Sequence, residues 1–159
     1  MPKQKVKIIP INNFILLSLI TFGIYELVWF YRGWKLLKNK KKMNINPFWR
    51  AFFSPFYAGD FAKNFQEFLK DKDLKIEKSD SKNIGMIYFI LSILYILPNP
   101  FWMISFFTFI PLLPLVKNMN RFYKVENPKL KPKKFNWLQK ILVVIGVVFL
   151  IIIFFGNLS

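Results

Sequence analysis

Long apolar segments alternate with short lysine-rich stretches along this chain. The clearest apolar segment covers residues 137–155 and is interrupted by one charge, Lys140. At about 1.5 Å per residue, a helix of this length would reach about 29 Å, close to the thickness of the hydrocarbon core of a bilayer. Lys140 falls one turn inside this helix, so its side chain can extend to the lipid headgroups. The segment therefore predicts a transmembrane helix.

The uncharged stretch 84–116 is too long for one transmembrane helix, and a Pro-Asn-Pro sequence interrupts it at 98–100. Because proline ends helices, the pattern predicts two helices, over 84–97 and 101–116, joined by a tight turn. Each helix is short for a full crossing. A thinned bilayer and a hairpin that does not quite cross the membrane both stay open.

The first apolar segment covers residues 8–31, contains Glu26, and carries a Thr-Phe-Gly break at 21–23. Aromatic residues cluster at its end, and the basic stretch 32–42 follows directly, which is the order expected of an aromatic belt at a membrane surface. A cleavable signal peptide is the competing interpretation. No small-residue cleavage site follows the segment, so we expect it to be retained.

The segment 47–62 is rich in aromatic residues, yet it carries Arg50, Asp60 and a central Ser-Pro pair. It could span the membrane, re-enter it or lie flat on it. Over residues 61–77, apolar side chains recur on one helical face and charged side chains on the other. This pattern predicts an amphipathic helix, either at the membrane interface or as the cytosolic extension of a membrane helix.

Together these segments predict an all-α fold, a single polytopic membrane domain over residues 1–159 with about four to five apolar helices, some of which could be re-entrant or interfacial. An Asn-Pro-Phe-Trp sequence occurs at 46–49 and again at 99–102, with similar residues following each copy. If the two segments are copies of one unit, 47–62 should cross the membrane as 101–116 does. Coincidence in a chain rich in Phe and Pro is the alternative.

Lysine and arginine total 24 against 8 acidic residues, a formal net charge of +16. Short cytoplasmic loops carry an excess of basic residues, so 63–83 and 117–136 are expected on the cytoplasmic side, with the C-terminal tail outside. The stretch 32–42 and the lysines before residue 8 favour the cytoplasmic side too. A single crossing of the membrane between them would place them on opposite sides. Either 8–31 is a re-entrant wedge bent at Gly23, or one basic stretch lies outside.

The basic stretches also predict contact with anionic lipid, because each basic group near an anionic leaflet contributes about 1 kcal/mol of attraction. The lysines bracket apolar segments and do not form a separate basic domain, so nucleic-acid binding is not expected. The lysines expected at the lipid headgroups are Lys35, Lys38, Lys40, Lys41, Lys42, Lys131, Lys133 and Lys134.

Two carboxylates and one guanidinium, those of Glu26, Asp60 and Arg50, lie within or at the edge of apolar segments. A charge at membrane depth costs about 2.5 to 3.5 kcal/mol on insertion scales, so such residues usually pair or mark a pathway. Glu26 and Arg50 both lie near aromatic belts, which predicts an intramembrane ion pair between them. Asp60 could be an additional buried charge. The alternative is that each group is solvated at the headgroup level.

The chain contains no His and no Cys, which excludes disulfides, thiol nucleophiles, histidine bases and the common zinc and haem sites. No nucleophile, metal cluster or phosphate-binding glycine loop accompanies the two carboxylates, so we expect neither an enzyme nor a cofactor or metal site.

The function we expect is that of a non-enzymatic scaffold or interaction protein, which binds the bilayer, its anionic lipids and a membrane protein partner or a second copy of itself. A small transporter or ion-conducting subunit is the alternative. The polar residues within 84–116 would line a pore only thinly; besides the tyrosines they are Ser92, Asn99, Ser105 and Thr108.

A further motif is formed by Thr21-Phe22-Gly23-Ile24-Tyr25, followed by Trp29-Phe30-Tyr31 and Trp34. The chain resembles a family of small uncharacterised bacterial multi-pass inner-membrane proteins with an N-terminal TFGIY...WFY..W signature. The block Asn46-Pro47-Phe48-Trp49-Arg50-Ala51-Phe52-Phe53 is similar to a second block of that family. The resemblance covers about the first 70 residues. It implies a multi-pass protein of the cell inner (cytoplasmic) membrane and implies no established activity.

Overall fold

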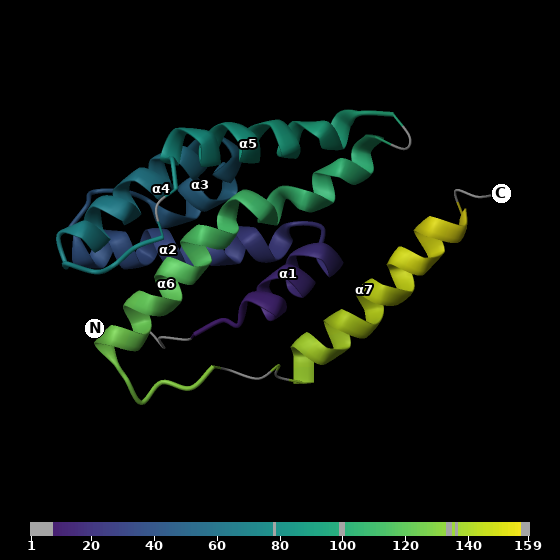
Figure 1. Cartoon of the computed structure of the whole chain (residues 1–159). Helices are drawn as coiled ribbons and strands as arrows, with labels where there is room; N and C mark the ends of the chain where they lie inside the picture. The colour runs from purple at the N-terminus through teal and green to yellow at the C-terminus, as the bar shows by residue number, and fades with distance from the viewer. Residues whose placement is uncertain (1–7, 78, 99–100, 133–134, 136, 157–159) are drawn as a thin grey trace.

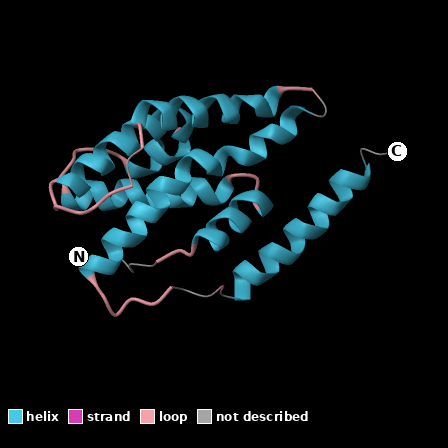
Figure 2. Ribbon diagram, in the orientation of Figure 1, coloured by secondary structure: helices cyan, strands magenta, loops and turns pink. Residues whose placement is uncertain are grey.

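The computed structural model describes residues 8–77, 79–98, 101–132, 135 and 137–156. Over these residues the regular structure is entirely helical, as Figure 2 shows, so the expected all-α class is confirmed. Two of the elements, η1 and η2, are 3₁₀-helices, and Figure 1 labels the α-helices. The order along the chain is α1 (Ile11–Ile20), α2 (Ile24–Lys40), α3 (Pro47–Phe52), α4 (Ser54–Lys70), α5 (Ser81–Ile93), η1 (Leu94–Ile96), η2 (Phe101–Leu112), α6 (Leu113–Glu126) and α7 (Trp137–Gly156).

The break at 21–23 turns the chain back on itself, so that α1 and α2 form a hairpin (Figure 1). Gly23 has φ 82° and Phe22 φ 51°, the left-handed conformation that glycine adopts most readily. The Thr21 hydroxyl donates to the carbonyl of Leu17 at 2.6 Å and accepts from the N–H of Tyr25 at 3.0 Å, which satisfies one backbone group of each helix.

Both ends of this hairpin point the same way, which corresponds to the wedge bent at Gly23. Residue Ile9, just before α1, exchanges two hydrogen bonds with the side chain of Asn120 in α6, at 3.0 and 2.7 Å. At ten residues, α1 is about 15 Å long, roughly half of the hydrocarbon thickness. The basic stretch 32–42, in the C-terminal half of α2 and just after it, therefore returns to the end of the molecule from which α1 starts.

The segment predicted at 47–62 is not one helix, because the chain bends at Phe53 between α3 and α4. The Asn46 side chain caps α3 by accepting from the N–H of Phe48 at 3.0 Å, and Pro47 occupies the first turn. The first Asn-Pro-Phe-Trp copy thus starts a short helix, and Asn99 and Pro100 of the second copy lie outside the described residues.

The amphipathic helix predicted at 61–77 ends earlier, at Lys70. Its apolar residues Phe61, Phe65, Phe68 and Leu69 are buried as expected. The chain then turns through Asp73, which has φ 53°, and the residues that follow form a loop whose Ile76 packs against the core.

η2 continues directly into α6, and together they form a 26-residue helix, Phe101–Glu126. Twelve residues of 3₁₀-helix rise about 24 Å, whereas the same residues in an α-helix would rise about 18 Å. This helix is the one described helix long and apolar enough to cross a membrane. The shorter apolar helices cover Ile11–Ile20, Ser81–Ile96 and Gln139–Ile152.

The 3₁₀ winding divides η2 into distinct faces, because residues three apart lie on the same side of such a helix. One face is buried in the bundle, and another is exposed. The buried face carries Ser105, Thr108 and Pro111, and the exposed face carries Phe101, Ile104, Phe107 and Ile110.

Aromatic rings fill the core between α2 and α4. The ring of Phe61 lies 5.3 to 5.4 Å from the rings of Trp29, Phe30 and Trp34. A side chain at Gly33 would meet the Phe61 ring at 2.5 Å, so the absence of a Cβ lets the two helices pack closely. Helix α7 lies apart from this core and packs on α1, where Gly146 contacts Ile20.

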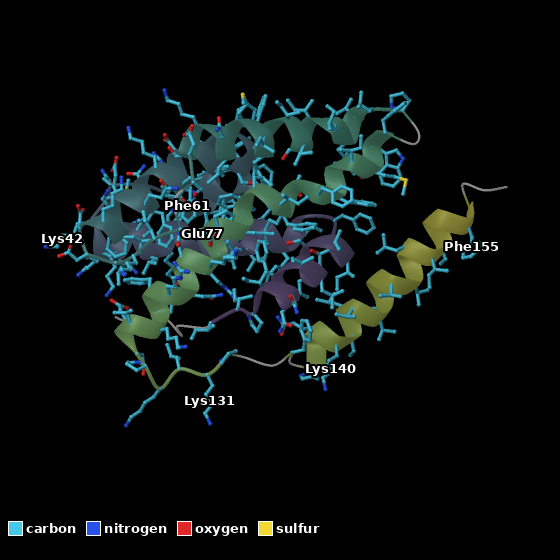
Figure 3. All side chains as sticks on the ribbon, in the orientation of Figure 1. Lys42, Phe61, Glu77, Lys131, Lys140 and Phe155 are labelled. Carbon is cyan, nitrogen blue, oxygen red and sulfur yellow. The ribbon has the colours of Figure 1, made fainter. Side chains whose placement is uncertain are left out.

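The two ends of the molecule differ in polarity. Lys42 and Lys131 lie on the side of the view opposite to Phe155 (Figure 3). At the other end, Ile96, the last residue of η1, is 83% exposed. Three ion pairs draw the C-terminal ends of α2, α4 and α6 and the loop after α4 together. They join Lys40 with Glu126 at 2.5 Å, Lys41 with Glu67 at 3.4 Å, and Lys117 with Glu77 at 3.1 Å.

Helices α4 and α5 approach each other closely at Gly59 and Gly85, and we predict that Gly85→Ala destabilises the protein. The new Cβ would lie 2.7 Å from Gly59 Cα, so one helix backbone has to shift. Overpacking of this kind costs about 1 to 3 kcal/mol. The free energy of unfolding in detergent measures it. Met86→Ala, at the exposed neighbouring residue, is the control and should change stability by about 0.5 kcal/mol or less. Equal effects of both variants would contradict the close contact.

Candidate functional site: a buried carboxylate beside a cavity

Glu26 lies in the first turn of α2, directly after the turn at Gly23, and only 1% of the residue is exposed. The position follows from the break in the apolar segment, because α2 restarts at Ile24 inside the bundle. The partial positive charge at a helix N-terminus favours a carboxylate there. The sequence places this charge within an apolar segment, and the fold surrounds it with other helices.

One oxygen of the Glu26 carboxylate has a partner. The Thr108 hydroxyl of η2 donates to Oε1 at 3.0 Å. The second oxygen, Oε2, is buried without a hydrogen-bond partner, and the same is true of the Ser18 hydroxyl of α1. The hydroxyls of Ser18 and Tyr88 also lie close enough to interact with this carboxylate. A buried carboxylate that is surrounded by neutral hydroxyls and has no counter-charge is incompletely compensated for the loss of its hydration.

A cavity of about 230 Å³ borders Glu26. Side chains of α2, α4, α5, η1 and η2 contribute to its walls, and the described residues that line it include one charged side chain, that of Glu26. The other polar groups on the walls are hydroxyls. They belong to Ser54, Tyr88, Ser92, Tyr95, Ser105 and Thr108.

Several of these hydroxyls use their hydrogen inside the protein. Ser92 donates to the carbonyl of Tyr88 at 2.7 Å, and Ser105 donates to the carbonyl of Trp102 at 2.6 Å. Thr108 donates to Glu26, as above. Because a hydroxyl has one hydrogen and two lone pairs, these three groups retain acceptor capacity only.

Arg50 and Glu26 are not brought together, so the predicted ion pair between them is corrected. The Arg50 guanidinium lies 3.6 Å from the carboxylate of Asp60 and over the rings of Trp34 and Tyr57, at 4.6 and 5.1 Å from the ring centres. Trp34 is eight residues after Glu26, which corresponds to about 12 Å along α2. The bend at Phe53 turns Arg50 toward this more distant part of α2 and toward α4.

Asp60 is not a buried charge, in contrast to the expectation from the sequence. Its side chain is 57% exposed on the outer face of α4, where it faces Arg50. The hydrophobic pattern places it in an apolar segment but does not give the direction in which it points.

The lysines predicted at the lipid headgroups have different environments. Lys40 and Lys41 form ion pairs, and Lys35 lies over the ring of Tyr31 at 5.8 Å. Lys38, Lys42 and Lys131 are exposed, whereas Lys133 and Lys134 lie outside the described residues. Headgroup contact by these lysines stays a prediction.

The grouping of these hydroxyls around Glu26 is not predicted from the sequence. The sequence gives Ser92, Ser105, Thr108 and the tyrosines only as a thin lining of a pore, and it does not point to Ser54. Their spacing carried a signal: Tyr88, Ser92 and Tyr95 recur at intervals of four and three, which places them on one helical face. Ser105 and Thr108 are three apart in the next segment.

Within the described part of the chain, no group of three or more acidic, His or Cys side chains could hold a metal ion.

We predict that Arg50 couples energetically to Asp60 and not to Glu26. Arg50→Ala removes two ring contacts, each worth about 0.5 to 1 kcal/mol, together with an exposed ion pair worth about 0.2 to 1 kcal/mol. Double-mutant cycles on the free energy of unfolding measure the coupling. Arg50→Ala with Asp60→Ala should be less destabilising than the sum of the single changes. Arg50→Ala with Glu26→Gln should be additive, and a non-additive result there would restore the pair predicted from the sequence.

Comparison with known proteins gives one partial match. The model of a family described as "Domain of unknown function (DUF4234)" matches residues 10–40, which contain α1 and α2. Proteins of this family are typically small membrane proteins. No curated protein and no solved structure matches the chain. The matched region includes the motif at 21–31 and Glu26, while the block at 46–53 lies outside it.

Proposed function

We propose that this is a multi-pass protein of the cytoplasmic membrane, which acts without catalysis as a scaffold or interaction protein and binds anionic lipid at its basic end. The observation that carries the proposal is the separation of charge and hydrophobic surface. Basic side chains gather where the ends of α2, α4 and α6 meet, and exposed apolar side chains cover the turn after η1 and helix α7. Such a polarity orients a protein in a bilayer.

The short helix α3 supports the same placement. It exposes Phe48, Trp49 and Phe52, each by more than half, and Arg50 lies on the same helix. Neighbouring rings on this helix are in contact, with Phe48 and Trp49 at 5.3 Å. Exposed aromatic side chains next to a basic residue are typical of the boundary between headgroups and hydrocarbon. We therefore assign α3 to the cytoplasmic interface.

The proposed topology follows from the lengths of the helices. The α1–α2 hairpin enters as a wedge and returns. Helix α5 with η1 enters the membrane, and η2 with α6 returns. Helix α7, whose 20 residues rise about 30 Å, crosses to the outside, although the apolar stretch Gln139–Ile152 within it is shorter than a full span. The basic stretches 32–42, 63–83 and 117–136 would then all lie on the cytoplasmic side, which agrees with the positive-inside rule without an external basic loop.

A transporter or ion-conducting subunit is the second candidate function. It is favoured by the Glu26 cavity and by the broken helix beside it, because transporters often place their sites where helices are interrupted at membrane depth. Liposomes containing the protein distinguish the two functions: flux of a solute or ion above that of empty liposomes favours transport, and its absence together with lipid binding favours the scaffold.

The topology predicts the activity of reporter fusions in cells. Alkaline phosphatase, which is active outside, should be inactive after Lys42, Glu77 and Glu126 and active at the C-terminal end. A fluorescent protein that folds only in the cytoplasm should give the opposite pattern. The fusion after Glu126 is the control, because the stretch 117–136 is expected on the cytoplasmic side. An active phosphatase after Lys42 would show that α1 and α2 do not form a wedge.

Anionic lipid should be retained through the exposed lysines of the basic end. We predict that combining Lys38→Gln, Lys42→Gln and Lys131→Gln weakens binding of phosphatidylglycerol by at least about tenfold, since each basic group contributes about 1 kcal/mol. Lipid retained by the purified protein, measured by mass spectrometry at several salt concentrations, tests this. The matched change of the same lysines to Arg keeps the charge and should retain the lipid. Equal retention by the Gln and Arg variants would contradict the proposed lipid contact.

A further inference from the structure

We propose that the cavity beside Glu26 is a binding site for a small organic cation that carries an ammonium group with N–H donors. This inference goes beyond the proposed scaffold function, because it concerns the interior of the bundle and not its basic surface. It rests on the buried carboxylate, on the hydroxyls that surround it and on the apolar part of the wall.

The charge of the site comes from Glu26. Its Oε2 atom is buried without a hydrogen-bond partner, and the described residues that line the cavity include no basic side chain. Arg50, the nearest candidate from the sequence, is held by Asp60 and the Trp34 ring. A carboxylate in an apolar bundle is stabilised by a counter-charge, and here a bound cation can supply it.

The hydroxyls set the hydrogen-bonding character of the site. Ser92 and Ser105 donate to backbone carbonyls, and Thr108 donates to Glu26 Oε1. Each of them can therefore offer only lone pairs to a ligand. Three of the six hydroxyls on the wall are thus restricted to accepting, and the others can accept as well as donate. Together with the carboxylate they suit a ligand rich in donors, and an alkylammonium group has up to three N–H donors.

The remaining wall favours an organic ligand over a bare metal ion. Phe22, Leu27, Phe52 and Pro55 face the same cavity with carbon atoms. Such surface can contact methyl or methylene groups, and aromatic rings attract ammonium cations. At about 230 Å³ the cavity is smaller than the roughly 300 to 1,000 Å³ of sites for drug-sized molecules, so the ligand should have few non-hydrogen atoms.

Titration calorimetry on the full chain in detergent tests the proposal, with ethylammonium chloride as the probe. We expect saturable binding, at least about tenfold weaker binding of tetramethylammonium, which has no N–H group, and no saturable binding of sodium or potassium at the same ionic strength. Glu26→Gln, which keeps the size of the side chain, should weaken ethylammonium binding at least about tenfold. Glu67→Gln, at an exposed acid of α4, is the matched control and should bind as the unmodified protein does.

Because a change at Glu26 could impair folding, Ser105→Ala provides a second test. It removes one acceptor on the cavity wall and should weaken ethylammonium binding while the thermal midpoint stays within a few degrees. The absence of saturable binding, equal affinity in Glu26→Gln, equal affinity for tetramethylammonium, or binding of sodium in place of ethylammonium would each overturn the proposal. Lipid retention by Glu26→Gln should be unchanged, so this test and the test of the proposed function fail independently.

Discussion

The ring of Phe61 lies directly on Gly33, and the arrangement of the other helices depends on this contact. A Cβ at Gly33 would approach the ring to 2.5 Å, so α2 and α4 could not pack as they do with any larger residue. Rings of α2 enclose Phe61, with Trp29 and Trp34 at 5.4 and 5.3 Å. Edge-to-face contacts of this kind contribute about 0.5 to 1.5 kcal/mol each beyond the burial of area. Since α2 carries Glu26 at its start and the basic residues at its end, one packing contact positions both the cavity and the charged end.

The polarity of α2 along its length links the two proposed sites. Its first turn lies among hydroxyls inside the bundle, and its last turn forms ion pairs with α4 and α6 through Lys41 and Lys40. In water it would be unfavourable for such a helix to bury its acidic residue and expose the apolar residues beside it. In the proposed membrane placement this order is favourable, because hydrocarbon would surround the exposed Ile24 and Val28 while the acid turns inward.

Hydropathy and turn residues predicted much of the fold. The breaks at Gly23 and at 98–100 and the long C-terminal helix all follow from residue types that a short sequence window contains. The partners of buried charges do not, because they require the rotation of each helix about its axis. Thr108 is 82 residues from Glu26, and no local pattern connects them. Arg50 was assigned to Glu26 on similar expected depth, but the bend at Phe53 directs it to Asp60 and Trp34.

The 3₁₀ winding of η2 accounts for two features that an α-helix would not give together: the length of the segment and the alignment of Ser105 with Thr108. Pro111 lacks the N–H that an α-helical hydrogen bond needs, and the segment is wound more tightly. In the proposed membrane placement, the larger rise per residue would lengthen a hydrophobic segment that is otherwise short for the bilayer. With three residues per turn, Ser105 and Thr108 lie one above the other, whereas in an α-helix they would be rotated by about 60°. The same winding therefore places both hydroxyls on the buried face of η2, where they line the cavity and Thr108 donates to the carboxylate of Glu26.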